Sequence, residues 1–176
     1  AFTMLKGHDK GEVPSMVREA WKLASILRRN RYAKGALDLD FPEVRAVMDK
    51  DGRVTDIITE EYDESHQLIE ECMLAANEAV ALTLKNRNRP TIYRVHEEPD
   101  SAKLFEFGQL CKLYGHPVHD IGQRQYLNEL MKSIKGSPDE QLLKLALLKS
   151  LMRARYDTEP LGHYGLATAN YCHFTS

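Results

Sequence analysis

Apolar residues recur every three to four positions over much of this 176-residue chain, and this is the spacing of amphipathic helices. In the first such stretch Pro14 suits an initial helical turn, and Gly35 ends the basic run that follows. The pattern predicts helices at residues 14–31, 63–85, 101–114, 126–134 and 137–155. Helix therefore dominates the predicted structure.

Short runs of β-branched and aromatic residues predict a few strands. Residues 37–48 and 53–59 are expected to form a hairpin, because the Asp-Lys-Asp-Gly sequence at 49–52 is typical of a turn. Further strands are predicted at Thr91–His96 and over most of Gly162–Ser176. Since strands and helices do not alternate regularly, the predicted fold class is α+β, helix-dominated, with a β-hairpin and a few short strands.

Short polar side chains stand at the starts of three predicted helices. Asp63 and Asp100 each precede a helical pattern, where a carboxylate accepts hydrogen bonds from the first free backbone N–H groups. The sequence Ser137-Pro138-Asp139-Glu140 predicts a capping box with Pro in the first turn.

The composition fits one globular domain. Hydrophobic residues make up 43% of the chain and charged residues 28%, which is too apolar for a disordered segment. No run of about 18 apolar residues occurs, so no transmembrane helix is expected. Residues 1–12 contain no signal-peptide core and are expected to be a flexible lead-in to a single fragment over residues 1–176.

Cysteine usage and charge restrict the compartment and the partners. Three widely spaced cysteines argue against a disulfide framework or a zinc ribbon, so a cytoplasmic location is expected. The formal net charge is −2, whereas nucleic-acid-binding domains usually carry a basic excess. Contact with RNA would therefore come from the local basic clusters at Arg28–Lys34 and Lys85–Arg89, or from parts of a parent protein outside this chain. The alternative for both clusters is that they only complement helix C-termini.

Two groups of residues are candidate metal ligands. Asp38 and Asp40 would share one face of a strand, where they could hold Mg²⁺; the alternative is the solvent-facing edge of the hairpin. His116 and His119, with Cys111 and Asp120, are a second candidate set, for zinc, but their spacing fits neither the HExxH motif nor a C₂H₂ finger. We expect no metal site within the chain.

Four blocks of the sequence resemble a known family, and the three strongest occur in the order that the family has. They are Gly35–Glu43 (Gly-Ala-Leu-Asp-Leu-Asp-Phe-Pro-Glu), Leu68–Asn77, Thr91–Pro99 and Gly162–Ser176, which ends in His-Phe-Thr-Ser. They resemble the ribonuclease R / ribonuclease II (RNB) family of 3′→5′ exoribonucleases, and most closely its ribonuclease R branch. The resemblance runs from about Val17 to Ser176, so the chain is expected to be a fragment of the catalytic RNB domain.

The resemblance implies the activity of the parent protein. Such an enzyme hydrolyses single-stranded RNA processively from the 3′ end and releases nucleoside 5′-monophosphates, using Mg²⁺ held by aspartates. In the family the Asp-x-Asp-Asp segment lies upstream, and His-Phe-Thr-Ser runs into Pro-Ile-Arg-Arg-Tyr, whereas this chain stops at Ser176. We therefore expect no catalytic residue and no bound Mg²⁺ in this chain, which alone should be inactive.

The resemblance also implies which residues bind substrate. They are Glu71, Asn77, Tyr164, His173, Thr175 and Ser176. Glu71 is expected to recognise the sugar of the RNA, since a carboxylate that accepts from a 2′-hydroxyl separates RNA from DNA. Leu39 stands where some relatives place a base-stacking aromatic, which puts that contact in doubt.

Helical periodicity alone predicts a different position for Glu71. It predicts a core-facing stripe, with Glu71 and Glu78 on the opposite, solvated face. The stripe comprises Ile69, Cys72, Met73, Ala76 and Val80. For His173 the alternative to substrate binding is a packed or hydrogen-bonded strand histidine.

The expected partner of the parent enzyme is single-stranded RNA, with no DNA and no membrane. An exposed strand edge at residues 165–176 is expected to favour dimerisation. The alternative function is a non-enzymatic RNA- or protein-binding α+β module, since the same residues would serve either.

Overall fold

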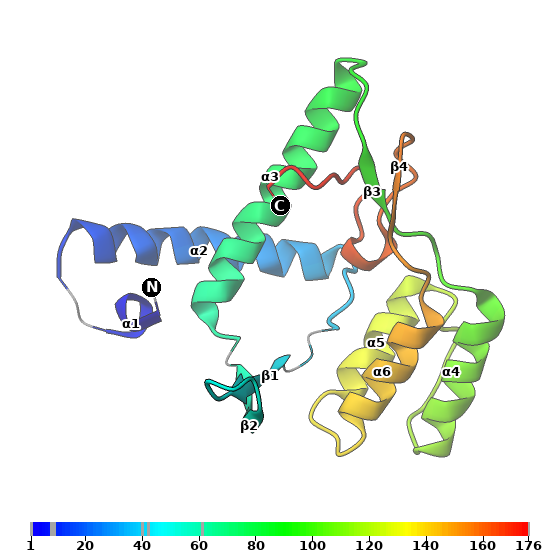
Figure 1. Cartoon of the computed structure of the whole chain (residues 1–176). Coiled ribbons are helices and arrows are strands. Elements are labelled where there is room, and N and C mark those ends of the chain that lie inside the picture. Colours follow the sequence, from blue (N-terminus) through cyan, green and yellow to red (C-terminus); the bar gives the residue numbers. More distant parts are fainter. Residues whose placement is uncertain (1, 8–9, 40, 42, 61, 176) are drawn as a thin grey trace. The chain divides into compact units, whose positions relative to one another are not determined.

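The computed structural model describes residues 2–7, 10–39, 41, 43–60 and 62–175 (Figure 1). The helices are α1 (Phe2–Lys6), α2 (Glu12–Ala33), α3 (Glu64–Asn86), α4 (Ser101–Leu113), α5 (Arg124–Ile134) and α6 (Glu140–Ser150), with a 3₁₀ turn, η1, at Tyr164–Leu166. The strands are β1 (Glu43–Met48), β2 (Val54–Glu60), β3 (Tyr93–Val95) and β4 (Arg155–Asp157). The predicted helix-dominated α+β class is confirmed.

Contacts divide the chain into two compact units. The first comprises Ala1–Arg28 and Asp40–Met73, and the second comprises Arg29–Leu39 and Leu74–Ser176. The unit boundaries fall inside α2 and α3, so each of these helices contributes to both units. Within the described ranges, no helix combines the length and apolar character needed to cross a bilayer.

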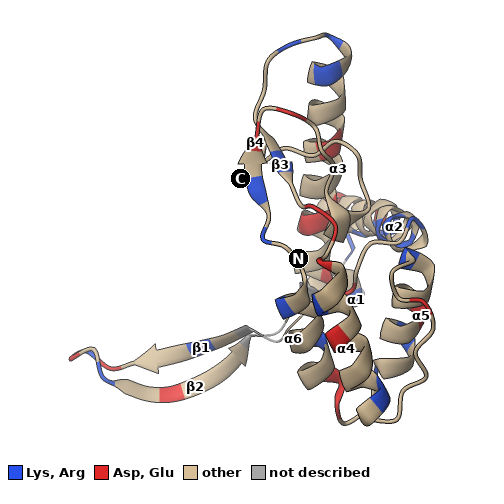
Figure 2. Ribbon diagram, turned by 90° about the vertical axis from the view of Figure 1, so that its right-hand side faces the viewer, with Lys and Arg blue, Asp and Glu red and all other residues tan. Residues whose placement is uncertain are grey.

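The predicted hairpin is confirmed in the first unit, where β1 pairs with β2 in antiparallel register (Figure 2). The turn is held by Asp49, whose Oδ1 accepts hydrogen bonds from the backbone N–H groups of Asp51 and Arg53, both at 2.9 Å. Strand β1 begins at Glu43, later than predicted. Apolar side chains of the hairpin are exposed, including Val44 at 67% and Ile57 at 68%.

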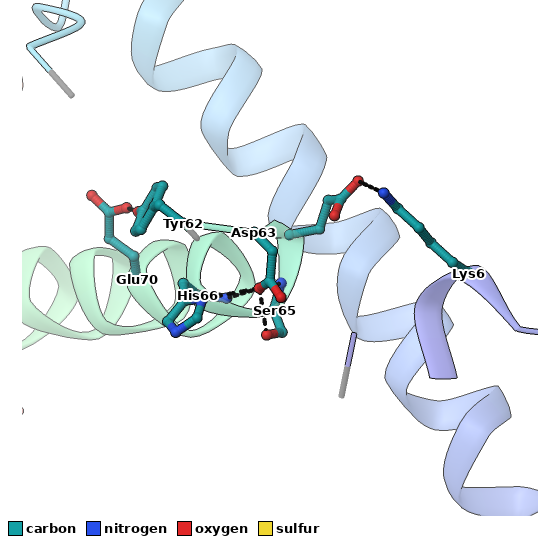
Figure 3. A network of polar contacts seen from close by, with 7 residues as sticks. Lys6, Tyr62, Asp63, Ser65, His66 and Glu70 are labelled. Carbon is teal, nitrogen blue, oxygen red and sulfur yellow. Dashed lines mark hydrogen bonds and ion pairs between the residues drawn. The ribbon is translucent and has the colours of Figure 1, made fainter. Parts of the chain in front are cut away.

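Asp63 caps α3 as predicted (Figure 3). Its Oδ1 accepts hydrogen bonds from the backbone N–H groups of Ser65 at 2.8 Å and His66 at 3.2 Å, and from the Ser65 hydroxyl at 2.6 Å. These hydrogen bonds lower the pKa of Asp63 to about 2, and the bond from the Ser65 hydroxyl has the largest effect. In the first turn of α3, Glu64 pairs with Lys6 of α1 at 3.4 Å, so a helix stands where the sequence predicted only a lead-in.

In the second unit, α4, α5 and α6 surround a core of leucine, isoleucine and aromatic side chains. Asp100 caps α4 as predicted, accepting from the N–H groups of Ala102 and Lys103. Among the side chains of the core, Leu127, Ile134, Leu143 and Leu147 are fully buried. Burial of this apolar surface is the main stabilising contribution to the unit.

The predicted capping box at α6 is wrong in detail. Asp139, not Ser137, occupies the N-cap position, and its side chain makes no capping bond. Glu140 instead accepts a hydrogen bond from the Gly136 N–H at 2.7 Å, while the Ser137 hydroxyl is buried without a hydrogen-bond partner in the described structure. The carboxylate therefore closes the turn one residue earlier than the motif implies.

Helix α6 also ends before the predicted position. The backbone turns extended at Leu151, and Arg155 pairs with Val95 in the two-stranded β3–β4 sheet. Pairing across the sheet overrides the local helical pattern here. Strand β3 itself falls within the predicted strand at Thr91–His96.

The C-terminal segment is not the predicted strand. Residues 164–166 form η1, and His163 makes only isolated bridges to His96 and Thr168. Left-handed backbone at Gly162 (φ 89°) and Ala167 (φ 54°) interrupts any extended run. The strand edge on which the predicted dimerisation depended is therefore absent from the described part of residues 165–176.

Candidate functional site

Asn77 on α3 holds the segment Tyr171–Thr175, which we call the anchored segment. Its side chain is 1% exposed, and Oδ1 accepts from the Phe174 N–H at 3.0 Å and the Thr175 N–H at 2.9 Å. The Thr175 hydroxyl also donates to Oδ1, at 3.1 Å, and Asn77 Nδ2 donates to the Tyr171 hydroxyl at 3.1 Å. One buried amide thus fixes both the backbone and a side chain of the segment.

Cys172 is the apolar anchor of the same segment. It is buried in a small cluster with Ala81, Tyr93 and Val95, and its thiol donates to the Asn77 backbone carbonyl at 3.4 Å. Burial raises the pKa of the Cys172 thiol, so the sulfur stays protonated at neutral pH. The role of Cys172 is packing.

The anchored segment presents His173 between two tyrosines. His173 is exposed, its Nδ1 lies 3.0 Å from the Tyr156 hydroxyl, and its ring contacts the Tyr156 and Tyr171 rings edge-on. The Arg94 guanidinium lies 4.8 Å from the centre of the Tyr156 ring. The exposed imidazole and phenol, with the half-buried Arg94 guanidinium beside them, are groups that stack on bases and bind phosphates.

These rings continue a longer histidine–tyrosine row inside the second unit. Its members, in spatial order, are Tyr164, His96, His163, Tyr171, His173 and Tyr156. Successive ring centres lie 6.1, 5.1, 5.4, 5.8 and 5.7 Å apart. Every contact in the row is edge-on, which is a favoured geometry for aromatic pairs.

The inner histidines of the row are neutral at pH 7. Burial, and next the neighbouring His96, lowers the pKa of His163 to about 4. Burial also lowers the pKa of His96; Met152's carbonyl opposes this shift, and the charges of Arg124 and Arg94 add to it. His96 Nδ1 accepts from the Gly165 N–H at 3.1 Å, so the inner histidines hold the backbone of η1 in place.

Tyr164, a predicted substrate-binding residue, lies in the core of the second unit. It is 8% exposed, and burial raises the pKa of its hydroxyl. The Arg124 guanidinium lies 3.9 Å from the ring centre and donates to the Tyr164 carbonyl at 2.7 Å. The structure gives Tyr164 a packing role, and substrate contact by this residue stays a prediction.

Glu71, in the first unit, does not lie on a solvated face. It is 2% exposed, whereas Ile69 of the predicted core stripe is 57% exposed and Cys72 is also exposed. The prediction of the buried face from periodicity is therefore wrong. A buried carboxylate needs a partner, and Arg28 supplies one at 3.7 Å.

The structure brings together some of the predicted substrate-binding residues. Asn77, His173 and Thr175 meet at the anchored segment, while Glu71 belongs to the other unit and Ser176 lies outside the described residues. Tyr156 was not predicted as a neighbour of His173, because a loop was expected after residue 155, whereas Tyr156 lies in β4. Tyr156 and His173 meet only through tertiary contacts, so no local sequence pattern indicates that they are neighbours.

The described residues do not fit a Mg²⁺ or zinc site. No group of three or more His, Cys, Asp or Glu side chains among them lies close enough to hold a metal ion. Asp38 pairs with Lys135 at 2.9 Å, and Asp40 is outside the described part of the chain. Burial raises the pKa of Cys111 to about 11, so this thiol is a poor metal ligand.

Comparison with known proteins gives consistent matches. The family model described as "RNB domain" matches residues 3–176. Ribonuclease R of Aquifex aeolicus is 36% identical over 157 residues, covering 88% of this chain, and ribonuclease R of Thermotoga maritima is 36% identical over 168 residues, covering 92%. The chain spans only 22% and 23% of the lengths of these relatives.

A solved structure shares both sequence and fold with the chain. It is Mycoplasma genitalium RNase R in complex with ribose methylated single-stranded RNA, with 25% identity and a TM-score of 0.90. The similarity covers 99% of this chain and 28% of that one. With a family match over nearly all of its residues, the chain belongs to the RNB domain family.

Proposed function

We propose that this chain is the RNA-holding part of a longer 3′→5′ exoribonuclease that degrades single-stranded RNA processively to nucleoside 5′-monophosphates. The observation that carries the proposal is the anchored segment, in which buried Asn77 holds exposed His173 and Thr175. The RNB domain match over residues 3–176 supports the reaction class. A cytoplasmic location is part of the proposal, and the three cysteines are free thiols.

The proposed reaction depends on Mg²⁺, but no described residue group in this chain fits a Mg²⁺ site. We therefore propose no residue of this chain as a ligand of the metal or as a group that cleaves the phosphodiester bond. The proposed task of the chain is positioning, which lowers a barrier by fixing the scissile bond near the reacting groups. Alone, the 176-residue chain should be inactive.

His173 and Tyr156 are the residues proposed to touch RNA. Both are exposed, and their rings meet edge-on at 5.7 Å. An exposed imidazole or phenol contacts bases and phosphates without reading sequence, as a processive enzyme requires. Asn77 is a positioning residue in this account, because its amide is engaged with the anchored segment.

Glu71 is proposed to accept a hydrogen bond from a ribose 2′-hydroxyl, with Arg28 orienting the carboxylate. Since Glu71 is 2% exposed, this contact requires the covering side chains to move. In the full-length protein Glu71→Ala should narrow the preference for RNA over DNA. An unchanged preference would leave Glu71 as a structural partner of Arg28.

The test of the proposed function is degradation of 5′-labelled single-stranded RNA with Mg²⁺ by the full-length protein and by the 176-residue chain. The full-length protein should shorten the RNA from its 3′ end and release nucleoside 5′-monophosphates, and the chain alone should leave it intact. Metal-dependent shortening by the chain alone would contradict the assignment. Absence of cleavage by the full-length protein would favour a non-enzymatic binding module.

A further inference from the structure

The second unit contains a cavity of about 640 Å³ that the proposed function does not use. Its walls come from residues 32–38, from α5 and from α6. Protein cavities of about 300–1,000 Å³ are the usual size for small-molecule ligands. The cavity is therefore large enough for a nucleotide.

Cationic side chains outnumber acidic ones in the cavity wall, although the whole chain carries a formal charge of −2. Five cationic residues line it, namely Lys34, Arg124, Lys132, Lys135 and Lys144, against two acidic residues, Asp38 and Glu129. In Figure 2 lysine and arginine positions are visible along α5. The lining thus has a local excess of positive charge.

Two of these cations are available to a ligand. Lys135 pairs with Asp38 at 2.9 Å, and Lys144 pairs with Glu140 at 2.8 Å. Lys34 and Lys132 are exposed and have no ion-pair partner among the described residues.

Helix C-termini do not cancel this charge. The ends of α2 and α5 contribute about half a negative charge each. With Glu140 counted, the charged groups around the cavity are five cationic and three acidic, so a positive excess remains.

The wall of the cavity is held in one arrangement before any ligand binds. Arg124 donates to the carbonyls of Gly35 at 3.0 Å and Tyr164 at 2.7 Å, and Asn128 donates to the Gly35 carbonyl at 3.2 Å. Gly35 has φ +101°, and a Cβ there would lie 2.6 Å from Arg124 Cδ. Such a preformed frame reduces the ordering cost of binding.

We propose that this cavity binds a phosphate group, carried either by a free mononucleotide or by an RNA strand. Lysine ammonium groups bind phosphate oxygens as point charges, and Lys34 and Lys132 supply two of them. Tyr32 also lines the cavity and offers an aromatic surface for a base. Phosphate binding in this cavity would not require nuclease activity.

The experiment is NMR titration of the isotope-labelled 176-residue chain with inorganic phosphate, AMP, adenosine and a five-nucleotide RNA. Backbone signals of Gly35, Ala36 and Asn128 should shift and saturate with a phosphate-bearing probe but not with adenosine. The K34Q/K132Q variant should bind at least tenfold more weakly. The matched control is K112Q/K149Q, which removes the same charge from residues that do not line the cavity and should stay within twofold of the wild type.

Each outcome decides the proposal. Saturation with AMP identifies a mononucleotide phosphate, and saturation with the RNA but not AMP identifies a strand phosphate; either supports the site. Absence of saturable shifts at the cavity, or equal weakening in both variants, would overturn it. A thermal melt of each variant verifies that the fold is retained.

Discussion

Asn77 illustrates how one buried side chain can place several exposed ones. Its carboxamide satisfies two backbone N–H groups and two hydroxyl groups of the anchored segment. These donors and acceptors would otherwise have to find water or remain unpaired, and unpaired buried groups are costly. The exposed position of His173 therefore depends on a residue that is itself 1% exposed.

At Asn77, substitution by alanine should release the anchored segment. Loss of the shared acceptor should cost about 1–3 kcal/mol of unfolding free energy. Urea unfolding gives this free energy, and hydrogen exchange should rise at Phe174 and Thr175. The matched control is Asn86→Ala at the exposed end of α3, which should change neither quantity. If both substitutions changed the unfolding free energy and the hydrogen exchange equally, Asn77 would not anchor the segment.

Removal of the Glu71 carboxylate should also destabilise the chain. Truncating one partner of a fully buried ion pair costs about 3–5 kcal/mol, but the Arg28 side chain is 20% exposed, so we expect about 1–3 kcal/mol for Glu71→Ala. The control is Glu19→Ala, which breaks an exposed pair with Lys22 and should cost less than about 1 kcal/mol. The urea midpoints of the two variants give the two losses of unfolding free energy. Equal losses would contradict a buried ion pair between Glu71 and Arg28.

At the scale of elements, the long helices and the hairpin were predictable because their signals are local. Apolar spacing located α2, α3, α4 and α5, and the Asp49 turn located the hairpin. The segment after residue 150 was not predictable, because β4 forms through pairing with β3. Of the candidate site, His173 and Thr175 of the anchored segment were predicted from family resemblance, whereas their neighbour Tyr156 was not.

The close approach at the residue 35 turn gives a sharp test. Gly35→Ala forces a Cβ to within 2.6 Å of Arg124 Cδ at a positive φ, so we expect a loss of about 2–4 kcal/mol. Gly115→Ala has a similar φ of +83° with no atom within 4 Å, and should cost only about 1 kcal/mol. Thermal or urea unfolding measures both. Equal losses would mean that backbone strain alone, and not contact with Arg124, makes glycine necessary.

The inner histidines make the histidine–tyrosine row sensitive to acid. Their pKa values are lowered in the folded state, to about 4 for His163, so the unfolded chain binds more protons between the ordinary value of 6.5 and pH 4. Their contribution is complete above pH 6.5 and is lost as the pH falls toward 4. Between pH 7 and pH 5 we expect a loss of about 1 kcal/mol from His163, after allowance for partial exposure.

Urea unfolding across this pH range measures the effect. His163→Asn should flatten the pH dependence, whereas His119→Asn, on an exposed residue, should preserve it. The Asp63 cap contributes only in a lower window, because its pKa is about 2, and its contribution is lost as the pH falls from 3.8 to 2. If the unfolding free energy of His163→Asn fell with pH as steeply as that of the wild type, His163 would not be the source of the acid sensitivity.

At the scale of the whole molecule, the proposal is that the chain shares the work of an exoribonuclease with other parts of a longer protein. It spans 22–23% of the length of the first two relatives. Its described residues supply the anchored segment and a cationic cavity, and they contain no group of three or more His, Cys, Asp or Glu that could hold a metal ion. Its proposed contribution is therefore to hold RNA in position.

The most direct measurement is crosslinking of the full-length protein to single-stranded RNA that carries 4-thiouridine at its 3′ end, followed by peptide mapping. We expect crosslinks at Tyr156 or within the anchored segment, and we expect them to be lost in Asn77→Ala but not in Asn86→Ala. Crosslinks found only outside residues 1–176, or unchanged in Asn77→Ala, would contradict it.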